Sequence, residues 1–144
     1  MLKSLFKKRT SPICKNIIDL YAKEQNDSAY ILLSNNQDHL TSTDCKAIVQ
    51  SRRDNSAFDS AYILLTRLSA QMDSSDLTQL AKEGLETGCE SHCRHVLDTY
   101  GEKLSKSELK SIQSAAENGY ESFHAQAQRL LTPPKKRKQS AYTG

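Results

Sequence analysis

Residues 59–72 read DSAYILLTRLSAQM, and the first seven letters of this stretch occur a second time at residues 27–33. The two copies of DSAYILL lie 32 residues apart. The spacing continues beyond them, because Leu40, Met72 and Leu104 occupy one phase of the same period. A period of this length is typical of stacked supersecondary units, each of which buries its apolar side against its neighbour. The sequence therefore predicts a repeat protein.

The periodicity inside each copy is that of an α-helix. Ala61, Leu64, Leu65, Leu68 and Met72 recur at helical spacings, so they share one face of a helix. No stretch of the chain alternates in the way that a strand does. The pattern predicts eight helices, near residues 11–25, 27–39, 42–54, 57–72, 74–87, 89–102, 106–118 and 120–131.

Three of these helices begin with the same chemistry. The segments 41–44, 73–76 and 105–108 each start with an oxygen-bearing side chain and end with a carboxylate, as a helix capping box does. The intervening connections are short, so neighbouring helices should pack antiparallel. The predicted fold is all-α: tandem antiparallel helical hairpins with a repeat of about 32 residues, stacked as a short α-solenoid or a curved helical bundle.

Charge divides the 144-residue chain into three parts. The whole sequence has 20 basic and 17 acidic residues, a formal net charge of +3. Residues 1–9 and 132–144 each contain four basic residues and no acidic one, which leaves 10–131 with 12 basic against 17 acidic residues, or −5. We predict a basic N-terminal segment at 1–9, an α-helical repeat domain at 10–131 and a basic, disordered tail at 132–144.

The sequence also suggests a location. The longest apolar run, residues 61–65, is far shorter than the roughly 18 residues that a membrane span requires, so no transmembrane segment is expected. Without a secretory signal, the four cysteines are expected to be reduced, and an intracellular, cytoplasmic protein is predicted. Residues 134–138 resemble a short nuclear localisation signal, which would direct the protein to the nucleus of a eukaryotic cell. A cluster that binds anions, or a tail that is only solvated, is the alternative for Lys135, Lys136, Arg137 and Lys138.

One segment has the residue types of a metal site. On a helix, Cys89, His92 and Cys93 stand at i, i+3 and i+4, close enough to share a zinc ion. Against this hypothesis, the repeat aligns Cys93 with Ala29 and Ala61, and a cysteine in place of a small apolar residue is most simply a core residue. We therefore predict no metal and no cofactor.

The expected function follows from the architecture. Helical repeat arrays mostly bind other proteins, so we predict a non-catalytic protein–protein interaction module, such as an adaptor, an inhibitor or an effector-like protein, with a protein or peptide partner. No catalytic or cofactor-binding residue is predicted, because no phosphate loop, G-x-S-x-G or H-E-x-x-H motif is present. Two alternatives are a nucleic-acid-associated protein that uses its basic ends, and a zinc- or thiol-dependent activity between Cys89 and His95. Self-association is left open.

Overall fold

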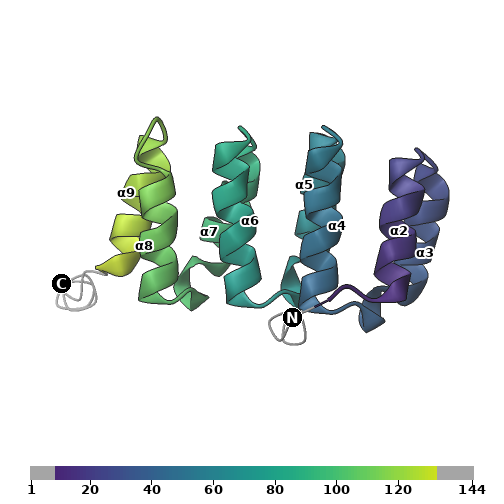
Figure 1. Ribbon diagram of the computed structural model, residues 1–144. Coiled ribbons are helices and arrows are strands. Elements are labelled where there is room, and N and C mark those ends of the chain that lie inside the picture. The colour runs from purple at the N-terminus through teal and green to yellow at the C-terminus, as the bar shows by residue number, and fades with distance from the viewer. Residues whose placement is uncertain (1–8, 133–144) are drawn as a thin grey trace, which may run out of the picture. The chain divides into compact units, whose positions relative to one another are not determined.

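The computed structural model describes residues 9–132, and within that range the chain is helical and contains no strand (Figure 1). The all-α prediction is confirmed. The chain divides into two compact units, one up to Leu77 and one from Thr78. The boundary lies inside helix α6 (Ser74–Glu86), so this helix contributes its first turn to unit 1 and the rest to unit 2.

Unit 1 is built from pairs of helices. Its described elements before α6 are α2 (Pro12–Ala22), α3 (Asn26–Asn36), η1 (Gln37–His39), α4 (Ser42–Asp54), α5 (Phe58–Leu68) and η2 (Ser69–Gln71), where η denotes a short 3-10 helix. Helix α2 packs on α3, α4 packs on α5, and α2 also contacts α4. Figure 1 shows the first two pairs side by side, each joined by a tight turn.

Unit 2 continues in the same manner. After α6 it contains α7 (Glu90–Tyr100), η3 (Gly101–Lys103), α8 (Lys106–Ala115) and α9 (Glu121–Leu131). Helix α8 packs on α9, which also contacts α7 and η3. All eight predicted helices are present in residues 9–132. The predicted ends at residues 39, 72 and 102 ran too far as α-helix, because each of these helices tightens into a 3-10 turn before it stops.

The helix starts follow the capping chemistry that the sequence indicates. Complete capping boxes form between Thr41 and Asp44 and between Ser105 and Glu108. At the third start, the Asp73 carboxylate accepts a hydrogen bond from the main-chain N–H of Asp76 at 2.9 Å. Each contact satisfies an N–H group that has no partner within its own helix, which fixes the first turn.

One of these carboxylates also joins two helices. Asp44 is fully buried, and its Oδ1 accepts the main-chain N–H of Ser11 at 2.8 Å while Oδ2 accepts the Ser11 hydroxyl at 2.9 Å. Ser11 is the N-cap of α2 and Asp44 lies in the first turn of α4, so one side chain holds both helix starts together. Ser42 and Asp76 are linked in the same way, through the Ser42 hydroxyl and Asp76 Oδ2 at 2.5 Å.

The turns inside the helical pairs use a left-handed residue. Glu24 and Ser56 have a φ of 60° and Gly88 has a φ of 80°. In the second of these turns the N–H of Ala57 donates to the carbonyl of Arg52, and the N–H of Ser56 donates to that of Arg53, which is the Schellman pattern. The chain therefore changes direction within three residues, and the next helix packs antiparallel against the one before it.

The apolar stripe that defines the predicted helices forms the core. Ala61, Leu64, Leu65, Leu68 and Met72 are all buried in unit 1. In unit 2 the interior includes side chains from four helices: Leu80, Ala81, Cys93, Val96, Leu97, Leu109, Ile112, Phe123 and Ala127. Burial of this kind is what stabilises helices that would be too short to persist alone.

Candidate functional site

The three residues considered as metal ligands and set aside lie at the start of α7 and are buried. Cys89 precedes the helix, and His92 and Cys93 lie in its first turns; all three side chains are buried. Burial raises the pKa of the Cys93 thiol to about 12, which disfavours the thiolate that a zinc ion or a nucleophilic reaction needs. Among residues 9–132, no three His, Cys, Asp or Glu side chains are grouped as metal ligands are.

The basic cluster at Lys135, Lys136, Arg137 and Lys138 lies outside the described residues, as does most of the basic segment at 1–9. The proposed targeting or anion-binding role of these segments therefore stays a prediction.

The most distinctive surface of the described chain is apolar and belongs to unit 1. Five large side chains of α3 and α5 are exposed, and we call them the α3–α5 face: Tyr30, Ile31, Phe58, Tyr62 and Ile63. Their exposed fractions run from 37% to 59%. At roughly 200 Å² for each large side chain, the five together expose on the order of 500 Å². This total is spread over two helices, and exposed apolar surface of a few hundred Å² on a monomeric protein is often functional when it is contiguous.

Helix geometry and one contact relate the residues of this face to one another. Phe58 and Tyr62 are four residues apart on α5, and so are Ile63 and Arg67, so each pair shares one side of the helix. Arg67 then reaches across to α3, where its guanidinium carbon lies 4.8 Å from the centre of the Tyr30 ring. The contact between Arg67 and Tyr30 therefore joins α3 to the Ile63 side of α5, whereas Phe58 and Tyr62 lie on the other flank of α5.

Arg67, near the C-terminal end of α5, is held in position by several hydrogen bonds. Its Nε donates to Gln37 Oε1 at 2.6 Å and Nη2 donates to Ser34 Oγ at 3.1 Å, while Nη1 donates to the Tyr30 hydroxyl. In residues 9–132 no carboxylate forms an ion pair with Arg67, and two of its five N–H donors have no partner. The face thus contains a cation that is fixed in position but not neutralised.

The charges around the face are unequally placed. Asp27 lies one helical turn before Ile31, and Asp59 lies one turn before Ile63; both carboxylates are exposed. Arg67 lies one turn after Ile63. The α3–α5 face therefore has carboxylates at the N-terminal ends of α3 and α5 and the Arg67 cation toward their C-terminal ends, where the exposed Asp38 of η1 follows Gln37.

The sequence contains a signal for this face that is independent of the repeat. In DSAYILL, four large or medium apolar residues follow one another, whereas a single helical stripe accepts only some of them. Leu33 and Leu65 fill the core, so Tyr30, Ile31 and their counterparts at 62 and 63 must point elsewhere. The helical period alone therefore indicates that these side chains leave the core.

The corresponding positions of unit 2 have a different character. Residues 94 and 95 of α7, which the sequence repeat aligns with Tyr62 and Ile63, are Arg94 and His95. The Arg94 guanidinium lies over the Phe123 ring at 5.0 Å. The exposed apolar character is therefore a property of unit 1 and is not general to the fold.

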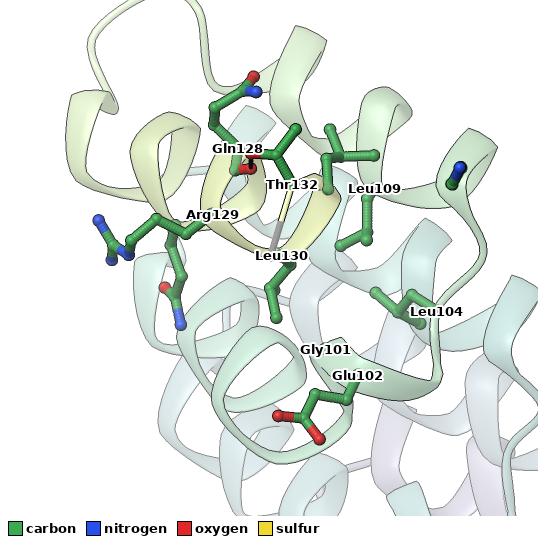
Figure 2. A pocket seen from close by; sticks show the side chains of 11 residues that line it. Gly101, Glu102, Leu104, Leu109, Gln128, Arg129, Leu130 and Thr132 are labelled. Carbon is green, nitrogen blue, oxygen red and sulfur yellow. Dashed lines mark hydrogen bonds between the residues drawn. The ribbon is translucent and has the colours of Figure 1, made fainter. Parts of the chain in front are cut away.

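Unit 2 contains a groove of about 730 Å³ between η3, the start of α8 and the end of α9 (Figure 2). Figure 2 shows Leu104, Leu109 and Leu130 along it, with Glu102 and Arg129 extending outward. Leu104 and Leu109 are already buried, and a Cβ added at Gly101 would lie 2.7 Å from Leu130 Cδ1. The apolar side chains along this groove are thus already packed against other residues of unit 2. The groove is therefore a weaker candidate for a binding site than the α3–α5 face.

Among residues 9–132, no helix has the length and apolar character needed to cross a membrane. Comparisons with protein-family models, with curated proteins and with solved structures found no match to the chain.

Proposed function

We propose that this chain is a non-catalytic protein–protein interaction module that binds its partner through the α3–α5 face. The exposure of Tyr30, Ile31, Tyr62 and Ile63 on adjoining helices is the observation that supports this proposal. Tyrosine and arginine are the residue types most enriched among the side chains that dominate binding energies, and this face contains both. The two DSAYILL copies place the same pair of side chains on each helix.

The non-catalytic character is part of the proposal. The thiols of Cys14, Cys45 and Cys93 are buried, and burial raises the pKa of each to about 12, so none of the three is suited to nucleophilic attack. The four cysteines are free and buried. A reducing, intracellular location is part of the same proposal.

Nucleic-acid binding is disfavoured for the repeat region. Residues 10–131 have a formal net charge of −5, and binding to phosphate backbones requires clustered positive charge. Any such contact would have to come mainly from residues 1–9 and 135–138, so it would be independent of the α3–α5 face. This separation allows the two functions to be tested by different variants.

Affinity capture from the native cell with three forms of the protein tests the proposal. The Ile31→Glu/Ile63→Glu variant places charge on the face, a truncation removes residues 132–144, and the wild type is the reference. Burying an isoleucine contributes about 1.5–3 kcal/mol to binding. The double variant should therefore bind the partner at least about tenfold more weakly and capture correspondingly less of it. The truncation should retain it. Loss of the partner on truncation, with retention by the double variant, would contradict the proposal.

A further inference from the structure

We propose that the partner presents a short amphipathic segment to the α3–α5 face, and that a carboxylate of this segment binds the guanidinium of Arg67. This inference rests on the proposed function and specifies the chemistry of the partner. It is carried by the geometry of Arg67, by the charges at the two ends of the face and by the size of the apolar area.

The guanidinium of Arg67 is preorganised to bind an anion. Its contacts with Gln37 Oε1, Ser34 Oγ and the Tyr30 hydroxyl use three of its N–H donors and fix the plane of the guanidinium. Two donors have no partner in the described part of the chain, and no carboxylate there forms an ion pair with it. A guanidinium that is already ordered loses little conformational freedom on binding, and its planar fork matches a carboxylate.

The charges give the bound segment a direction. Asp27 and Asp59 would repel an acidic residue at the starts of α3 and α5, whereas Arg67 would attract one near their ends. Ile31 and Ile63 lie between these charges and supply the apolar contact. A segment with its carboxylate at the Arg67 end and neutral or basic residues at the other end is complementary to this arrangement.

The size of the face favours a short segment over a second copy of the chain. From Asp59 to Arg67 the helix rises roughly 12 Å at 1.5 Å per residue. The apolar area of on the order of 500 Å² is less than the roughly 800 Å² that each partner contributes to a standard stable interface. A helix of two or three turns, with two large apolar side chains three or four residues apart, would cover it.

Random dodecapeptides displayed on phage provide the probe, selected on the full-length protein. Binders should be enriched in two large apolar residues at helical spacing with one Asp or Glu to one side. Synthetic copies should bind the Ile63→Glu variant about tenfold or more weakly. The matched control is His95→Glu, which adds the same charge at the corresponding position of α7 and should not change the affinity.

A double-mutant cycle then tests the contact with Arg67. Arg67→Gln is combined with replacement of the peptide's Asp or Glu by its amide, and a coupling of at least about fivefold is expected. Because Arg67→Gln also removes bonds between α3 and α5, its thermal unfolding is recorded, and Arg67→Lys is measured as a second variant that retains the charge. Arg67→Lys should bind more tightly than Arg67→Gln, and raised salt should weaken the wild type more than Arg67→Gln.

Each other result has a defined meaning. Peptides that depend on Ile63 but show no coupling to Arg67 would overturn this inference and leave the proposed function standing. Selected peptides that bind the Ile63→Glu variant as well as the wild type would overturn the inference and count against the α3–α5 face as a binding site. Dimerisation of the wild type in sedimentation, lost in Ile63→Glu, would identify a second copy as the occupant and would also overturn it.

Discussion

Replacement of Asp44 by alanine should destabilise unit 1 more than any other change to a helix cap. Its carboxylate is fully buried and accepts hydrogen bonds from the Ser11 N–H, the Ser11 hydroxyl and the Thr41 N–H at 2.8, 2.9 and 3.1 Å. A hydrogen bond to a charged group contributes about 1.5–3 kcal/mol, and bonds within one network are not additive. We therefore expect Asp44→Ala to lower the free energy of unfolding by about 3–5 kcal/mol.

The matched control is Glu108→Ala in unit 2. Glu108 completes a capping box of the same type with Ser105, but Asp44 in addition binds the start of a second helix. Loss of an ordinary cap contributes about 0.5–2 kcal/mol, so the control should remain in that range. Urea unfolding followed by circular dichroism measures both variants. Amide hydrogen exchange at Ser11 and Thr41 reports the local effect. A loss for Asp44→Ala no larger than that for Glu108→Ala would refute the reasoning.

The same carboxylate predicts a pH dependence. Burial alone would raise the pKa of Asp44, but the hydrogen bonds from Ser11 and Thr41 more than offset it and hold the pKa below its ordinary value. A lowered folded-state pKa contributes stability that is fully present above the unfolded value of about 3.9 and is lost as the pH falls through the folded value. The stability difference between the wild type and Asp44→Ala should therefore be constant near neutral pH and shrink in acid. A difference that grows in acid would contradict this assignment.

Two further changes test local features of the fold. Ser56→Gly should stabilise the protein by about 0.5–1 kcal/mol, because Ser56 has a φ of 60°, whereas Asn55→Gly at a φ of −92° should destabilise it; both are measured by thermal unfolding. Cys14, Cys45 and Cys93, whose pKa values burial raises to about 12, should react with a thiol reagent at pH 8 only after urea is added; rapid labelling of the native protein would show that these thiols are accessible.

The fold could be predicted because the copies of the repeat support one another. A single capping box is weak evidence for a helix start, but three at one phase identify the starts at Ser42, Ser74 and Lys106. The helix ends could not be predicted to the residue, since the tightening into η1, η2 and η3 depends on how each turn packs. In the turn after α4 the left-handed residue is Ser56 and not the adjacent Asn55, although asparagine adopts this conformation more readily. That the copies in the two units are structurally equivalent stays a prediction.

The site was harder to predict because it depends on contacts between distant residues. The helical period implies that Tyr30 and Ile31 leave the core, but it does not say whether another helix covers them. The hydrogen bonds from Arg67 to Tyr30 and Ser34 join residues more than thirty positions apart, and no local sequence pattern predicts them. Cys89, His92 and Cys93 show the reverse case. Their spacing in the sequence resembles that of metal ligands, but in the structure their side chains are buried in the interior of unit 2.

Methyl-resolved NMR of the isoleucine side chains tests the central claim most directly. Ile31 and Ile63 are 59% exposed on the α3–α5 face, whereas Ile17, Ile48 and Ile112 are fully buried. On addition of the captured partner, or of a peptide selected on the full-length protein, the signals of Ile31 and Ile63 should shift or broaden first. The buried methyl groups should change little. Shifts confined to Ile112 in unit 2, with Ile31 and Ile63 unchanged at saturation, would contradict the assignment of binding to this face.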